Sequence, residues 1–206
     1  MFNFKSFCAA FTLLSMFATT AAQAEGCDKV EVQATPFTHV VRSDVPARKM
    51  HAQMLAGRAF NTSEEGMALG MVVAAEDIGI NVTRDEAGCR VFNVKAGFAP
   101  ATVFVAEELK ESNCGYRHIR NHEMEHVRTY VEFTSTLAAT LSQKLSAVVS
   151  ENSQSDNEAV GKLLYNAIGE EFTKVYERQH ALDSNSEYTN NEKVCRGILM
   201  SIVKAV

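Results

Sequence analysis

Two histidines and a glutamate stand in the pattern H-E-x-x-H, as His122, Glu123 and His126. Residues four apart lie about one turn apart on one face of a helix, so both imidazoles can bind one metal ion. Glu123 can then stand beside a water molecule that the ion activates and act as its general base. The pattern is typical of zinc-dependent hydrolases. We therefore expect one zinc ion per chain and a catalytic role for Glu123.

The residues around this motif predict a long helix. The segment 116–145 contains neither Pro nor Gly, so nothing in it interrupts a helix. We expect a helix over 116–149, a polar turn over 150–156 and a second helix over 158–182. Because both helices rise at the same rate, residues that meet across this hairpin should have numbers that sum to about 306.

This register places the third metal ligand near the end of the second helix. His180 lies at the level of His126 and is the preferred third ligand, because imidazole is a common ligand of zinc. Asp183 and Glu187 are alternatives at a similar height. Asp183 can instead orient a liganding histidine from behind, and Glu187 closes a capping box that begins at Ser184 and starts a last helix.

The part of the chain before the motif predicts a small antiparallel sheet with one short helix. The expected strands cover 28–41, 71–75, 78–82, 89–94 and 101–105, and the expected helix covers 44–56. Turn residues at 84–88 and at 97–100 separate the later strands, so a hairpin should precede the motif helix. The last strand, Thr102–Val105, is either an ordinary sheet strand or an edge strand that pairs with an extended substrate.

The first 24 residues predict a secretory signal peptide. Lys5 is followed by an apolar run over 7–17 and by Ala22-Gln23-Ala24, which fits the small-residue cleavage rule. We expect cleavage after Ala24, a single domain over 25–206, and a secreted or periplasmic location. No later segment approaches about 20 uninterrupted apolar residues, so we expect no stable membrane insertion after cleavage.

The charge of the predicted mature chain excludes one class of partner. Removing 1–24 leaves 19 basic and 25 acidic residues, a formal charge of −6. This balance argues against binding of nucleic acid.

Four cysteines remain after cleavage, Cys27, Cys89, Cys114 and Cys195. An even number in an exported chain indicates disulfides, and four cysteines allow three pairings. We favour Cys89–Cys114, which would join a strand to the start of the motif helix, and Cys27–Cys195, which would join the mature N-terminus to the last helix.

The stretch from Cys114 to His126 resembles small bacterial families of predicted secreted zinc-dependent proteases, grouped under domains of unknown function. In those families a cysteine precedes the helix with H-E-x-x-H, strands come before it, and a long helix with a late acidic segment follows. Here 179–183 and 186–188 are similar to that late segment, and the resemblance covers 88–195. It implies a zincin-like α+β fold, zinc held by the two histidines of the motif, and a peptide or protein substrate.

A second interpretation is a non-catalytic envelope or secreted protein, joined by disulfides, whose metal site is structural or vestigial. The two interpretations differ in the coordination of the ion. A catalytic zinc site keeps one position open beside three protein ligands, whereas a structural site has four protein ligands.

Overall fold

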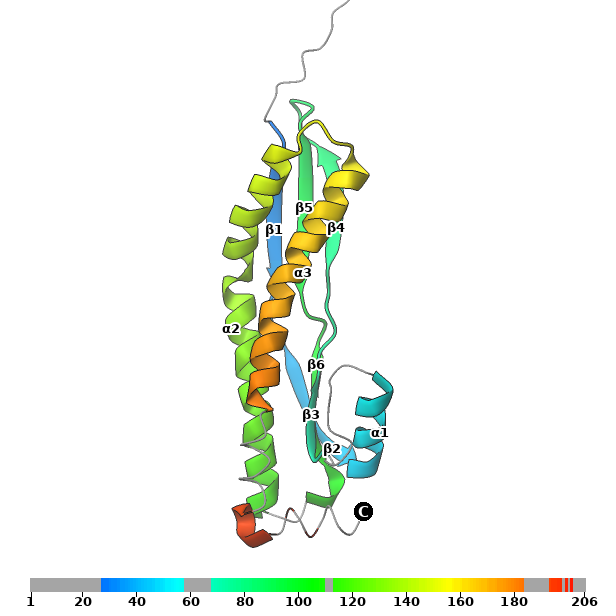
Figure 1. The fold of residues 1–206 in the computed structure, drawn as a ribbon, viewed down its shortest axis with the longest axis vertical. Coiled ribbons are helices and arrows are strands. Elements are labelled where there is room, and N and C mark those ends of the chain that lie inside the picture. The colour runs from blue at the N-terminus through cyan, green and yellow to red at the C-terminus, as the bar shows by residue number, and fades with distance from the viewer. Residues whose placement is uncertain are drawn as a thin grey trace, which may run out of the picture.

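The computed structural model describes residues 27–57, 68–109, 113–183, 193–197, 199 and 201. The molecule is elongated, with two long helices lying beside a ribbon of strands (Figure 1). The strands are β1 (Lys29–Thr35), β2 (His39–Val45), β3 (Gly70–Val73), β4 (Gly79–Arg84), β5 (Arg90–Gly97) and β6 (Ala101–Ala106). The helices are α1 (Ala47–Gly57), α2 (Asn113–Glu151) and α3 (Asn157–Leu182), with short 3-10 segments η1 (Glu107–Leu109) and η2 (Val194–Gly197).

The expected α+β class is confirmed, and so are the two long helices and the turn between them. Alternation of apolar and polar residues indicates a strand, and a segment without Pro or Gly indicates a helix. Both patterns are reliable here because each strand and each helix must bury one face. The predicted signal peptide lies outside the described residues. The predicted capping box at 184–187 also lies outside them. In the described part of the last predicted helix, Cys195 and Arg196 have φ of 56° and 55°, so a continuous helix there is wrong.

The strands form two three-stranded sheets that follow one another along the molecule (Figure 1). Their orders are β1-β5-β4 and β2-β6-β3. In each sheet the first pair of strands is parallel and the second is antiparallel. Backbone hydrogen bonds continue between the sheets, from Asp77 N to Gly97 O (2.9 Å) and from Ala101 N to Thr38 O (2.8 Å). The prediction of a purely antiparallel sheet is therefore wrong.

The turn predicted at 97–100 does not fold the chain back. β5 continues into β6, and each strand has partners on both sides, so Thr102–Val105 is a central strand rather than a substrate-binding edge. Gly97 has a different role. An ideal Cβ there would lie 2.7 Å from the carbonyl oxygen of Thr35, so glycine permits β1 to approach closely. The hairpin is instead β4–β5, whose turn was expected at 84–88.

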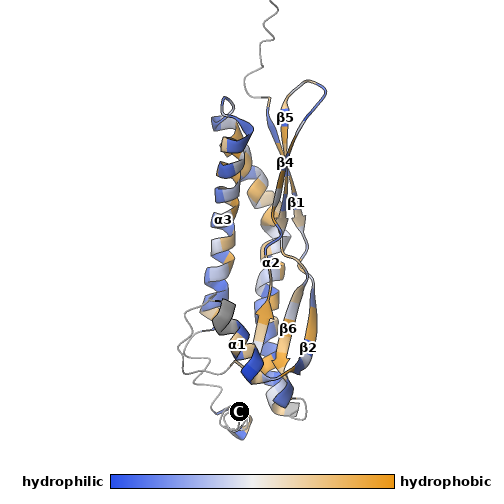
Figure 2. Ribbon diagram, turned by 90° about the vertical axis from the view of Figure 1, so that its right-hand side faces the viewer, coloured by the Kyte–Doolittle hydropathy of each residue, from blue (hydrophilic) through white to orange (hydrophobic). Residues whose placement is uncertain are grey.

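The larger of two buried apolar clusters among the described residues joins α2 and α3 to the strands. Asp156 caps α3, because its Oδ1 accepts a hydrogen bond from Ala159 N at 2.8 Å. Figure 2 shows the helices on one side of the strands, and hydrophobic and hydrophilic residues both occur along the strands. The largest fully buried side chains of this core are Phe92, Phe98, Leu137, Leu141, Leu145, Leu164, Ile168 and Phe172. Among the described residues, no helix is long and apolar enough to cross a bilayer.

The two disulfides are Cys27–Cys89 and Cys114–Cys195, with Cα atoms 5.5 Å and 5.7 Å apart. Both pairings favoured from the sequence are therefore wrong. The parallel register of β1 and β5 sets Lys29 beside Val91, so the cysteines two residues earlier are level.

The ends of α2 explain why Cys89 cannot reach Cys114. Arg90, the neighbour of Cys89, donates hydrogen bonds to the carbonyl oxygens of Ser153 and Ser155, in the turn after α2. Cys114 lies at the opposite end of this 39-residue helix. At 1.5 Å per residue, the two ends are about 55 Å apart.

Candidate metal centre

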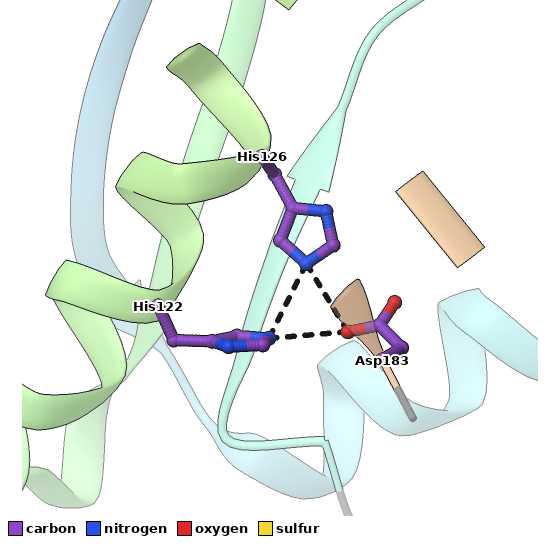
Figure 3. Close-up of side chains that lie close together, drawn as sticks. All are labelled: His122, His126 and Asp183. Atoms are coloured by element: carbon purple, nitrogen blue, oxygen red, sulfur yellow. Dashed lines mark hydrogen bonds and ion pairs between the residues drawn. The ribbon is translucent and has the colours of Figure 1, made fainter. Parts of the chain in front are cut away.

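Three side chains converge near the first third of α2. His122 and His126 project from α2, and Asp183 is the residue that ends α3 (Figure 3). Asp183 Oδ1 lies 3.1 Å from Nε2 of each histidine, and the two Nε2 atoms lie 3.3 Å apart. Among the described residues, this is the group of three ligand-type side chains that could hold a metal ion.

The spacing of these three atoms fits an ion of the size of zinc. A tetrahedral ion with bonds of about 2.0–2.1 Å keeps its ligand atoms about 3.3 Å apart. The observed separations of 3.1 to 3.3 Å are close to that value. The donor set of two imidazoles and one carboxylate is also one that zinc accepts. The position of Asp183 adds to this fit, because the C-terminal end of a helix carries partial negative charge and favours a cation.

The centre is open to solvent on one side. The side chain of Asp183 is 45% exposed, whereas those of His122 and His126 are 23% and 9% exposed. Asp183 is therefore the most exposed of the three side chains.

The preferred third ligand, His180, is not part of this group, and the alternative Asp183 takes its place. The reason is the rotational phase of α3. Its buried face includes Val175 and Gln179, four residues apart, and one further turn along this face leads to Asp183. His180 lies about 100° around the helix from Gln179 and is exposed. The second alternative, Glu187, lies outside the described residues.

The charges of the three residues support one another. Burial acts to raise the pKa of Asp183, but hydrogen bonds to both histidines outweigh it and hold that pKa well below its usual range. The hydrogen bond to Asp183 raises the pKa of His122. Burial opposes a similar rise for His126, yet Asp183 still raises its pKa. A cation is thus favoured between these side chains, either as a proton or as a metal ion.

Glu123 directly follows His122 on α2 and is 5% exposed. Burial raises its pKa to about 7, while the nearby charges of His126 and His122 act to lower it. A carboxyl group of this kind can take up and release a proton near neutral pH. Glu125 lies on a different face of α2, is exposed, and forms an ion pair with Arg128.

Sequence reasoning missed Gly70, the residue that leaves room for Glu123. An ideal Cβ at Gly70 would overlap Glu123 Oε1 and would lie 2.7 Å from Ile119 Cγ2 and 2.8 Å from Glu123 Cδ. These separations are shorter than real Cβ contacts. Close approach of strand backbone to a functional side chain is a known use of glycine in strands.

We expect Gly70→Ala to destabilise the fold by about 1–3 kcal/mol, because the added methyl group must displace a buried carboxyl group. Gly79→Ala is the matched control, since nothing lies within 4 Å of a Cβ at Gly79. The free energies of unfolding of both variants can be measured with denaturant. Equal stability of the two variants would show that β3 accommodates the methyl group without moving Glu123.

Tyr130 also escaped sequence reasoning, although it follows His126 by one turn on the same face of α2. Its ring stacks on Phe37 and meets the edge of Phe98, with ring centroids 4.9 Å and 4.7 Å away. Burial, followed by the charge of Asp183, raises its pKa to about 12. Tyr130 therefore belongs to the aromatic part of the core one turn from His126.

No known protein family, curated protein or solved structure matches this chain.

Proposed function

We propose that this protein is a zinc-dependent peptidase of the secreted or periplasmic compartment. In this proposal His122, His126 and Asp183 hold the ion, and Glu123 is the general base. One observation carries the proposal: the three ligand-type atoms lie at mutual distances of 3.1 to 3.3 Å, and the Asp183 side chain beside them is 45% exposed.

Each residue has a distinct part in the proposed chemistry. Zinc at this centre would polarise the scissile carbonyl group and lower the pKa of a water molecule. His122 and His126 bind through Nε2, because these are the atoms that converge on Asp183. Glu123 accepts the proton of the attacking water, since it follows His122 directly and its pKa of about 7 suits transfer near neutral pH.

The strand beside Glu123 favours an extended peptide as substrate. In the described sheet β3 pairs only with β6, so its other edge has no strand partner there. Leu69 O accepts a hydrogen bond from Ala106 N, and bonding alternates along antiparallel strands, so Gly70 and Val72 direct their N–H and C=O groups to that edge. An extended peptide can add to such an edge through its backbone.

The resemblance of the sequence to bacterial families of predicted secreted zinc-dependent proteases supports the proposal, because it includes strands before the H-E-x-x-H helix and a late acidic segment after it. Two disulfides also fit an oxidising compartment outside the cytoplasm.

Zinc content and cleavage of a peptide library by the purified mature chain test the proposal together. We expect one zinc ion per chain and cleavage that a chelator abolishes and added zinc restores. A chain with full zinc that cleaves no peptide would contradict the peptidase and favour the non-catalytic interpretation. A chain that binds no zinc would overturn the proposed centre itself.

A further inference from the structure

A glutamine lies behind the metal centre, where α3 packs against α2. Gln179 is 3% exposed. Its Oε1 lies 2.5 Å from Nδ1 of His126, and its Nε2 donates a hydrogen bond to the backbone carbonyl oxygen of His126 at 3.0 Å. One side chain of α3 thus contacts both the ring and the backbone of a single residue of α2.

The second hydrogen bond determines the orientation of the amide. A carbonyl oxygen accepts hydrogen bonds and cannot donate them, so the NH₂ group of Gln179 must face the backbone of His126. The amide oxygen then faces Nδ1 of His126. Because that oxygen can only accept, its hydrogen bond needs the proton on Nδ1. Asp183 Oδ1 is a second acceptor, 3.1 Å from Nε2, but Gln179 Oε1 is closer to the ring at 2.5 Å, so the geometry favours a neutral imidazole with its proton on Nδ1.

The proton on Nδ1 leaves the lone pair on Nε2. Nε2 is the atom that lies 3.1 Å from Asp183 Oδ1 and 3.3 Å from His122 Nε2. Without Gln179, the ring could turn over or carry its proton on Nε2, where it would block binding of a metal ion. Partners of this kind are a usual means of fixing the tautomer and orientation of a liganding histidine.

We propose that Gln179 is a positioning residue that fixes His126 as the Nδ1–H tautomer and directs its Nε2 toward the ligand position. The purpose of this role rests on the proposed metal centre, whereas the tautomer itself can be observed in the metal-free protein.

The position of Gln179 on α3 argues against simple packing. The buried residues of α3 that precede Gln179 are apolar except Glu171, whose carboxylate pairs with Lys144 and Lys174. A buried amide at the next position costs free energy unless its donor and acceptor are both satisfied. His126 satisfies both, so the polar residue is accounted for by that histidine alone.

Two variants of Gln179 separate positioning from packing. Gln179→Leu keeps a similar volume and removes both hydrogen bonds. Gln179→Glu keeps an acceptor opposite Nδ1. Gln143→Leu, at an exposed position of α2, is the matched control for the same chemical change. The mature full-length chain is used throughout, with zinc as the metal probe.

The first readout is the tautomer of His126, by nitrogen-15 NMR of the metal-free protein at alkaline pH, where imidazoles are neutral. We expect Nδ1–H in the wild type, in Gln179→Glu and in Gln143→Leu. We expect Gln179→Leu to shift toward Nε2–H, the form that free histidine favours. A wild-type protein with Nε2–H on His126 would overturn the proposal, whether or not zinc binds.

The second readout is zinc affinity. We expect Gln179→Leu to bind zinc roughly 10–100-fold more weakly than wild type, and Gln179→Glu to recover most of that loss. Equal weakening in both variants would overturn the positioning role and leave packing as the explanation. If the wild type has the Nδ1–H tautomer but binds no zinc, the positioning is supported while the proposed function fails.

Discussion

Glu123→Gln should remove nearly all peptide hydrolysis while leaving the fold and the bound zinc unchanged. Loss of a general base commonly lowers the rate by about 10²–10⁴. Glu123 does not belong to the group of ligand atoms, so zinc content should stay the same. Gln has the shape of Glu, so the tight contact with Gly70 is kept. The measurement is cleavage of the best library peptide, with zinc content determined on the same sample.

Glu125→Gln is the matched control for this experiment. Glu125 is exposed and paired with Arg128, so its loss should change neither zinc content nor the cleavage rate. Cleavage by Glu123→Gln at the wild-type rate would show that Glu123 is not the base.

Asp183→Ala should weaken zinc binding more than any change behind the ligands. In the proposed centre Asp183 is one of three protein ligands, so its loss removes a third of them. We expect the affinity to fall by more than about 100-fold, beyond the usual effect of residues that only support a ligand. Zinc titration of the metal-free variant measures this change.

His180→Ala is the control that distinguishes Asp183 from His180 as the third ligand. His180 lies in the last turn of α3 but outside the ligand group, so the zinc affinity of His180→Ala should equal that of the wild type. Loss of zinc from His180→Ala, with affinity kept in Asp183→Ala, would restore His180 as the third ligand.

The helical half of the fold could be predicted well from the sequence. A segment without Pro or Gly and with a periodic apolar stripe has few alternatives to a helix. The polar turn at 150–156 then defines which residues lie level in the two arms. The structure agrees with this register, since Asp183 meets His122 and Gln179 meets His126.

The register could predict the height of the third ligand but not its direction. The level of a residue along the hairpin depends on its distance from the turn. The direction of its side chain depends on which face of α3 is buried. The apolar residues define that face only as far as Val175, and beyond it the buried residue is the polar Gln179. The prediction of His180 followed ligand type, whereas following the buried face would have led to Asp183.

The strand pairing and the disulfides were predicted wrongly for a related reason. Alternation along a strand indicates a buried face but carries no information on which strand lies beside it. The parallel pair β1–β5 joins residues about 60 positions apart, and only that pairing brings Cys27 to Cys89. A hairpin of the strands at 89–94 and 101–105 would bring Cys89 close to the start of α2. Because β5 continues into β6 instead, Cys89 lies near the other end of that helix.

The long hairpin of α2 and α3 limits how this protein can change length. Asp183 meets His122 only because the number of residues between the turn and each partner places both on the facing sides. Deleting one residue from the middle of α3 would rotate everything after it by about 100° and carry Asp183 and Gln179 away from α2 together. Two full turns occupy about seven residues, so α2 and α3 would keep their facing sides if both changed by that number and the strands that reach Ser153 and Ser155 through Arg90 changed with them. The tolerated lengths therefore form a discrete series, and the far turn can move outward only in whole increments while the centre stays intact.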